Sequence, residues 1–410
     1  MRTLVFYYDI QCPYAWVAST RVAELTVLAE RVGVRVVWRP VLLGGIYRSI
    51  GAPDSPAMAM NPAKARLNLL DVTRGAELLG LPLRYHPRHP RRSVAAMRLL
   101  VGCDDAVRPA LTAALYRVYW VDNGDISDPE TLARVAREHG VDPSLASAPS
   151  SRQGLFDNTH EAVQIGAFGV PVFRLGDQMW YGGDRMHLVA QALGGAWPSP
   201  QPLPRSSAGH KITFFHDFSS PFSYLASTQI ERIAREENAE IEWVPMLLGA
   251  LFREVGTPDV PLLAMSDAKR RWYSRDLMLS AAWWQVPFGM PRHFPLRTVT
   301  ALRAAIVEPA LTSAIYAAVW SDGRNVGDKS VLQHVIDEAG FDGRSIIDRT
   351  SDPSIKGQLF TNTARAVASG VCGAPTCEVG GTVFWGQDRL EQVRAAVRGW
   401  RCSLDGAASR

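Results

Sequence analysis

The chain has no run of about eighteen apolar residues, which excludes a predicted transmembrane helix. Its first residues lead directly into an apolar strand, without a charged leader and a long apolar core, so we expect a cytoplasmic protein. The formal net charge of +4 over 410 residues is small, and basic residues do not alternate with aromatic ones in any run. Membranes and nucleic acids are therefore not expected partners.

Cysteine is scarce, and its spacing is uninformative for metals. None of the five cysteines forms a C-x-x-C pair or a zinc-like spacing; they are Cys12, Cys103, Cys372, Cys377 and Cys402. We expect reduced thiols and no metal site. Apolar residues make up 47% of the chain and charged residues 20%, which suits globular domains with their own cores.

The chain contains a long internal repeat. Residues 6–15 return as 214–223, and the copies differ at one position of chemical interest, where one has Cys12 and the other has Ser220. Further matches follow in the same order: 40–48 with 245–253, Lys64 with Lys269, 166–171 with 370–375, and 181–185 with 385–389. The offset stays near 200 residues, so the repeat is a duplicated domain and not a solenoid.

A segment rich in proline and serine separates the copies. Residues 196–209 hold four prolines and three serines, a composition typical of an extended spacer. We therefore expect domains over 1–195 and 210–400.

Each half has the same expected order of elements. A short buried strand (4–8 or 212–215) is followed by a helix that begins at a proline, and then by a second strand (34–38 or 241–244). The middle of each half, about 60–150 and 265–350, is rich in Ala, Leu and Arg at helical spacing. Hairpins over 172–180 and 376–385 and a closing helix complete each half. This order predicts an α/β fold of two tandem thioredoxin-like domains, each with an inserted all-helical subdomain.

Several segments resemble a known family. The pattern Asp-Phe-x-Ser-Pro-Phe-Ser-Tyr-Leu-Ala at 217–226 is similar to the signature of 2-hydroxychromene-2-carboxylate isomerases and kappa-class glutathione transferases. Leu-Leu-Gly-Gly at 42–45, Gly-Ala-Phe-Gly-Val-Pro at 166–171 and Phe-Trp-Gly-Gln-Asp-Arg-Leu at 384–390 resemble the same family. The resemblance covers nearly all of both halves and implies a DsbA-like thioredoxin fold with glutathione as cofactor.

Ser220 is the expected catalytic residue. The resemblance implies that a serine here donates a hydrogen bond to the sulfur of bound glutathione and lowers the pKa of its thiol. A residue just before a helix also lies in the field of unpaired backbone N–H groups, which favours an anion. The alternative is an ordinary N-cap, because serine before proline at a helix start needs no catalytic role.

Cys12 occupies the matching position in the first half and remains open to two interpretations. In thioredoxin-like disulfide oxidoreductases this position holds the attacking cysteine, but the place of the resolving cysteine is taken by Ala15. Cys12 is therefore either a low-pKa thiolate, which acts directly or as a mixed disulfide with glutathione, or a drifted residue in a half kept for its structure.

The resemblance also implies the residues that hold glutathione. Pro171 and Pro375 match the cis-proline of the fold, beside which the backbone of Val170 or Ala374 pairs with a peptide-like ligand. Lys64 and Lys269 are candidates for the glycine carboxylate. The remaining candidates are Trp272 as a flat wall, Asp184 and Asp388 for the γ-glutamyl ammonium, and Gln387 for a further hydrogen bond.

Together these features predict a glutathione-dependent isomerase, of the cis-trans or ring-opening type, or a glutathione transferase. The substrate is expected to be an aromatic or conjugated small molecule. The second half is the expected site, because Ser220, Lys269, Trp272, Gln387 and Asp388 all belong to it. Two other hypotheses remain: a thiol oxidoreductase that uses Cys12, and a binding or scaffolding protein with decayed sites. The chain is expected to form an intrachain pseudo-dimer, as a monomer or homodimer.

Overall fold

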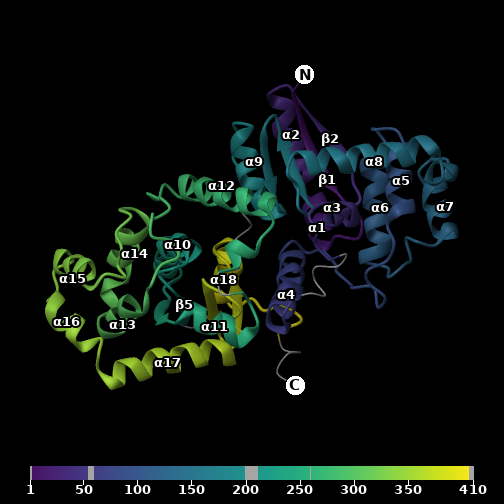
Figure 1. Ribbon diagram of the computed structural model, residues 1–410. Helices are drawn as coiled ribbons and strands as arrows, with labels where there is room; N and C mark the ends of the chain where they lie inside the picture. Colours follow the sequence, from purple (N-terminus) through teal and green to yellow (C-terminus); the bar gives the residue numbers. More distant parts are fainter. Residues whose placement is uncertain (1, 54–59, 199–210, 259, 406–410) are drawn as a thin grey trace. The chain divides into compact units, whose positions relative to one another are not determined.

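The computed structural model describes residues 2–53, 60–198, 211–258 and 260–405 (Figure 1). Most of the linker expected over 196–209 lies outside these ranges. No helix within them is both long and apolar enough to cross a membrane.

The chain forms two compact units, each described by itself below. Unit 1 consists of residues 1–59, 72–200 and 266–272, and unit 2 consists of 60–71, 201–265 and 273–410. Segment 60–71 of the first repeat thus belongs to unit 2, and segment 266–272 of the second repeat belongs to unit 1. A simple division at the linker does not describe this arrangement, because similarity between repeats does not say which copy a helix packs against.

The first repeat supplies four strands and nine α-helices among its described residues. In chain order the elements are β1 (Arg2–Tyr8), α1 (Pro13–Ser19), α2 (Val22–Arg31), β2 (Val34–Pro40), α3 (Leu43–Ser49), α4 (Pro62–Leu78), α5 (Val94–Gly102), α6 (Arg108–Trp120), α7 (Pro129–Glu138), η2 (Pro143–Ala146), α8 (Pro149–Gln164), β3 (Val172–Leu175), β4 (Gln178–Tyr181), η3 (Gly183–Arg185) and α9 (Met186–Ala192).

Among the described residues the second repeat follows the same order with three differences: one continuous helix replaces the pair α1 and α2, α16 replaces η2, and η4 and η5 are additional. Its elements are β5 (Lys211–His216), α10 (Pro221–Glu237), β6 (Glu240–Pro245), α11 (Leu248–Val255), η4 (Pro261–Ala264), α12 (Asp267–Trp283), α13 (Val299–Val307), η5 (Pro309–Leu311), α14 (Thr312–Trp320), α15 (Lys329–Glu338), α16 (Gly343–Arg349), α17 (Pro353–Ala368), β7 (Thr376–Val379), β8 (Thr382–Trp385), η6 (Gln387–Arg389) and α18 (Leu390–Val397).

Local sequence explains where several of these helices begin and end. Asp128 accepts a hydrogen bond from the backbone N–H of Thr131 at the start of α7, and Asp328 accepts one from Ser330 at the start of α15. α10 has Pro221 in its first turn and ends at Asn238, whose φ of 53° is left-handed.

Each unit contains a four-stranded mixed sheet. The strand orders are β2-β1-β3-β4 and β6-β5-β7-β8. The first two strands of each sheet are parallel, with Leu4 opposite Val36 and Ile212 opposite Ile241. The hairpin strands pair antiparallel, both with the first strand and with each other. A parallel pair needs a crossover, which α1 and α2 provide in unit 1 and α10 provides in unit 2.

Side chains alternate along β5 and fill two separate cores. Ile212 and Phe214 lie in one buried cluster with Ile230 of α10 and Val393 of α18. Phe215 points to the other face, into a cluster with residues of α11 and α17. Helices therefore cover both faces of the sheet.

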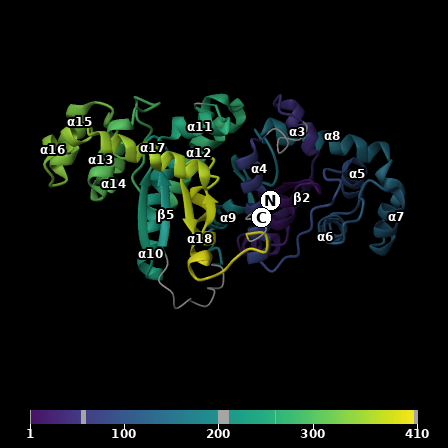
Figure 2. The same cartoon turned by 90° about the horizontal axis from the view of Figure 1, so that it is seen from below.

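The inserted helices gather away from the sheet. In unit 2 they share a buried cluster that includes Tyr316 and Trp320 of α14 and also Phe218, which lies in the turn before α10. Figures 1 and 2 show α13 to α16 together at one end of unit 2, and α5 to α7 together at one end of unit 1. The expected fold, two tandem thioredoxin-like domains with helical insertions, is confirmed.

Candidate functional site

Cys12 and Ser220 have nearly the same backbone at the start of equivalent helices. Their φ and ψ angles are −94° and 114° for Cys12 and −97° and 114° for Ser220, and both side chains are buried. The Ser220 hydroxyl accepts a hydrogen bond from the backbone N–H of Ser223 at 3.1 Å and donates one to the carbonyl of Ala374 at 3.0 Å. The Cys12 thiol donates to the carbonyl of Val170 at 3.3 Å, and among the described residues it makes no side-chain capping bond.

The carbonyls that accept these bonds each precede a cis-proline. The Val170–Pro171 and Ala374–Pro375 peptide bonds are both cis, as the family resemblance implied. In each unit the structure thus brings together the helix start and the backbone that were expected to flank the cofactor.

A buried carboxylate, which the sequence did not single out, holds the turn before each helix. Asp217 accepts hydrogen bonds from the backbone N–H of Ser219 at 2.9 Å, from that of Leu248 at 2.9 Å, and from the Thr298 hydroxyl at 2.7 Å. Burial raises the pKa of its carboxyl, and these three bonds oppose that shift. Asp9 accepts from the backbone N–H of Gln11 at 3.1 Å and of Leu43 at 2.8 Å in unit 1. The signal available in the sequence was that Asp9 and Asp217 match each other.

The inserted helices hold the same turn through its carbonyls. Trp320 Nε1 donates to the carbonyl oxygen of Phe218 at 2.9 Å. The Tyr316 hydroxyl lies 3.4 Å from the backbone carbonyl oxygen of Asp217. Trp120 and Tyr116 make the equivalent bonds in unit 1. The helical insertion therefore positions the turn that carries residue 12 or 220.

A second residue that sequence reasoning missed is His216. Its Nδ1 lies 3.0 Å from the Tyr316 hydroxyl, while its Nε2 is buried without a hydrogen-bond partner in the described part of the chain. Burial lowers the pKa of His216 to about 3, so the ring is neutral near neutral pH. Unit 1 has Tyr8 here, whose hydroxyl bonds to Thr112 at 2.7 Å.

The Cys12 thiol lies in an environment that opposes ionisation. Burial, as the largest cause, and the nearby Asp9 carboxyl together raise the pKa of Cys12 to about 12. Backbone N–H groups of the helix start lower this pKa, but by less than burial raises it. All five cysteines are buried and none forms a disulfide. Cys12 is therefore a protonated thiol near neutral pH.

Lys64 lies in unit 2, beside the backbone that flanks Ser220. Its Nζ is 5.5 Å from the centre of the Trp385 ring. Trp385 is packed so closely on Gly373 that a Cβ at that glycine would lie 2.7 Å from its indole Nε1. Gly373 directly precedes Ala374, whose carbonyl accepts the Ser220 hydroxyl.

Lys269 and Trp272 lie in segment 266–272, which belongs to unit 1, and their expected role beside Ser220 stays a prediction. Lys269 Nζ lies 5.9 Å from the ring centre of Phe168, and the Trp272 ring lies 5.5 Å from that of Phe168 and 5.5 Å from that of Tyr181. Trp272 is buried, so it fills a core instead of forming an open wall. The next residue, Tyr273, belongs to unit 2, where its ring lies edge-on to that of Phe222 at 5.6 Å.

The two acidic candidates follow glycines at the end of each hairpin. Gly386 has a φ of 111°, which only glycine adopts readily, and it turns the chain into the segment that carries Gln387 and Asp388. Gln387 is buried, and Asp388 lies 3.1 Å from Arg389. Arg389 is also paired with Asp71 of segment 60–71. Asp184 has the equivalent place in unit 1, where it lies 3.2 Å from Arg185.

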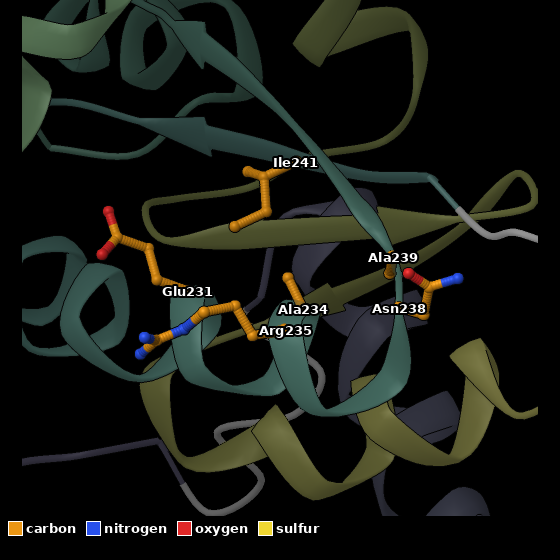
Figure 3. A pocket seen from close by; sticks show the side chains of 6 residues that line it. All are labelled: Glu231, Ala234, Arg235, Asn238, Ala239 and Ile241. Carbon is orange, nitrogen blue, oxygen red and sulfur yellow. The ribbon is translucent and has the colours of Figure 1, made fainter.

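A shallow hollow lies at the far end of α10 from Ser220 (Figure 3). Its lining residues are Glu231, Ala234, Arg235, Asn238, Ala239 and Ile241. A helix rises about 1.5 Å per residue, so this hollow is roughly 20 Å from Ser220 along the axis. It is not part of the candidate site. No group of three His, Cys, Asp or Glu side chains suited to a metal ion occurs among the described residues.

Comparison with known proteins identifies the family of both repeats. The family model of the DSBA-like thioredoxin domain matches residues 3–194 and again 211–398. The chain therefore belongs to the DSBA-like thioredoxin domain family and carries two copies of the domain. Within it, the chain is a tandem member of the group that contains 2-hydroxychromene-2-carboxylate isomerases and kappa-class glutathione transferases.

Two curated relatives illustrate the match. The 2-hydroxychromene-2-carboxylate isomerase of Sphingobium xenophagum is 30% identical over 194 residues, which cover 44% of this chain and 94% of the relative. Human glutathione S-transferase kappa 1 is 27% identical over 222 residues, which cover 49% of this chain and 95% of the relative. A solved 2-hydroxychromene-2-carboxylate isomerase is 24% identical with a TM-score of 0.41, covering 47% of this chain and 94% of that one.

The Cys12 environment leads to a first prediction. Because the thiolate is the reactive form, iodoacetamide should modify Cys12 more slowly than it modifies free glutathione at neutral pH. The rate should rise as the pH approaches the raised pKa of about 12. Peptide mass spectrometry after timed alkylation measures this rate. Rapid modification of Cys12 at neutral pH would contradict the buried, protonated thiol.

Proposed function

We propose that the protein is a glutathione-dependent isomerase or transferase whose active site is built around Ser220 in unit 2. Its substrate is an aromatic or conjugated small molecule. The observation that carries this proposal is the Ser220 hydroxyl, which is held at a helix start by the N–H of Ser223 and faces the backbone at the cis-proline.

The surrounding groups fit a tripeptide with charges at its ends. Lys64 supplies a cation for a carboxylate, and Asp388 supplies a carboxylate for an ammonium group. The backbone of Ala374 supplies hydrogen-bonding groups for a peptide that lies alongside it as a strand. Trp385, which is partly exposed and carries Lys64 near its ring, adds an aromatic wall.

The role of Ser220 follows from its two hydrogen bonds. The Ser220 oxygen accepts a hydrogen bond from the backbone N–H of Ser223. The single hydroxyl proton of Ser220 is donated to the carbonyl oxygen of Ala374. Rotation of the hydroxyl would redirect this proton towards the sulfur atom of bound glutathione. The first N–H groups of α10 act in the same direction, because they favour negative charge at that point.

Glutathione, when bound, supplies a thiolate that can add to a conjugated substrate and leave again. Ser220 stabilises this sulfur as an anion and keeps it available at neutral pH. Phe222, two residues after Ser220, and Tyr273, whose ring lies 5.6 Å from that of Phe222, are half-buried aromatic side chains. They offer rings against which an aromatic substrate can pack.

A thiol oxidoreductase centred on Cys12 has less support. Its thiol is buried, its pKa is raised to about 12, and Ala15 stands where a resolving cysteine would be needed. Calorimetry with glutathione distinguishes the proposed enzyme from a binding protein with decayed sites, because the proposed enzyme must bind glutathione.

Removal of the Ser220 hydroxyl provides the second prediction. Ser220→Ala should lower kcat/KM roughly a hundredfold, because it removes one hydrogen-bond donor to the reacting anion. Cys12→Ala is the matched control at the same position of the other unit, and its kcat/KM should stay close to that of the wild type. Turnover of a hydroxychromene carboxylate and of a chromogenic aryl halide, each with glutathione, measures both variants. The opposite pattern would place the chemistry in unit 1.

The two lysines give a third prediction. Lys64→Ala should weaken glutathione binding to the Ser220 site by about tenfold, because a charge-assisted hydrogen bond to a carboxylate is lost. Lys269→Ala is the matched control and should leave this affinity unchanged, since Lys269 belongs to unit 1. Isothermal titration calorimetry in a Cys12→Ala background reports the affinity. An equal loss in both lysine variants would refute the assignment of Lys64 to Ser220.

A further inference from the structure

At two pairs of matching positions, the side chains differ in size between the two repeats. Phe168 of the first repeat matches Cys372 of the second, and Leu67 of the first matches Trp272 of the second. Because segments 60–71 and 266–272 each belong to the unit of the other repeat, Trp272 lies with Phe168 and Leu67 lies with Cys372. Unit 1 therefore pairs two large side chains, Phe168 and Trp272, and unit 2 pairs two smaller ones, Cys372 and Leu67.

Unit 1 accommodates the large pair in an aromatic cluster. The ring centres of Phe168 and Tyr181 are 4.4 Å apart, and Trp272 contacts both rings at 5.5 Å. Phe168 and Trp272 are 6% and 8% exposed, so these two rings are buried against each other beside the half-buried Tyr181. Leucine in place of Trp272 would leave part of this space empty.

Unit 2 accommodates the small pair in an aliphatic cluster. Leu67 and Leu70 lie in one buried cluster with Cys372 and Val383. Leu67 and Cys372 are each 4% exposed, which leaves no room for an indole at position 67 without displacement of its neighbours.

Polar contacts at both ends of segment 60–71 also fit unit 2 and not unit 1. Asn61 Nδ2 donates to the Thr257 hydroxyl at 3.0 Å, and Gln392 Nε2 donates to Asp71 at 3.1 Å. The positions that match Thr257 and Gln392 in the first repeat are Ala52 and Leu188, whose side chains form no hydrogen bonds.

We propose that these matched pairs form a recognition device that assigns segment 60–71 to unit 2 and segment 266–272 to unit 1. A duplicated chain would otherwise offer each unit two similar segments. The device assigns Lys64 to the Ser220 unit and Lys269 to the Cys12 unit. It does not depend on the proposed glutathione chemistry, because it concerns packing alone.

An exchange of side chains tests this device by thermal unfolding, followed by circular dichroism. The variant Leu67→Trp with Trp272→Leu should lower the Tm by about 5 to 10 °C, since it creates a cavity in unit 1 and overpacks unit 2. Adding Cys372→Ala removes volume beside the new indole in unit 2 and should recover part of the loss. An unchanged Tm in the first variant, or no recovery in the second, would overturn the proposal.

A milder set of variants decides the matter if the exchanged proteins do not fold. Leu67→Phe should lower the Tm by a smaller amount in a Cys372→Ala background, where volume has been removed beside it. The same substitution in a Phe168→Ala background should cost as much as in the wild type, because Phe168 lies in the other unit. Equal losses in the two backgrounds would show that Leu67 does not distinguish the units.

Discussion

A carboxylate buried at the end of the first strand organises the region on which the candidate site depends. Asp217 binds the turn before α10, the start of α11 and the Thr298 hydroxyl just before α13. A buried charge is tolerated only when its hydrogen bonds are made, so these three elements are held to one geometry. Asp9 ties the turn before α1 to the start of α3 in unit 1. This explains why Cys12 and Ser220 share nearly the same backbone angles although their side chains differ.

Cys12 and Ser220 share a backbone conformation, but the sulfur of one and the oxygen of the other have different chemistry. At position 12 the sulfur belongs to the protein, and burial keeps it protonated. At position 220 the protein supplies only a hydroxyl, which can donate its proton to a sulfur brought by a ligand. In the proposed function, unit 2 uses its helix start for a cofactor thiol, while unit 1 keeps the fold with a thiol of low reactivity.

The sequence predicts the fold well, because strand and helix patterns repeat twice in the same order and each copy supports the other. It also singles out Cys12, Ser220 and two of the four cis-prolines, Pro171 and Pro375, which lie in short matching segments. It does not predict that Lys64 accompanies Ser220, since the repeats are similar enough for either segment to fit either unit by pattern alone. The two segments are distinguished by isolated differences between the repeats. One example is Thr257, which bonds to Asn61, where the first repeat has Ala52. Asp217 and His216 were missed because their importance comes from burial, and a one-dimensional pattern does not reveal it.

The most direct test of the account is a pH titration of the thiolate absorbance of glutathione bound to the protein, in the wild type and in Ser220→Ala. The account predicts that the wild type lowers the thiol pKa from roughly 8.5 towards neutral, and that Ser220→Ala returns it towards the value in water. The same pKa in both proteins would contradict the central claim that the Ser220 hydroxyl stabilises the cofactor sulfur.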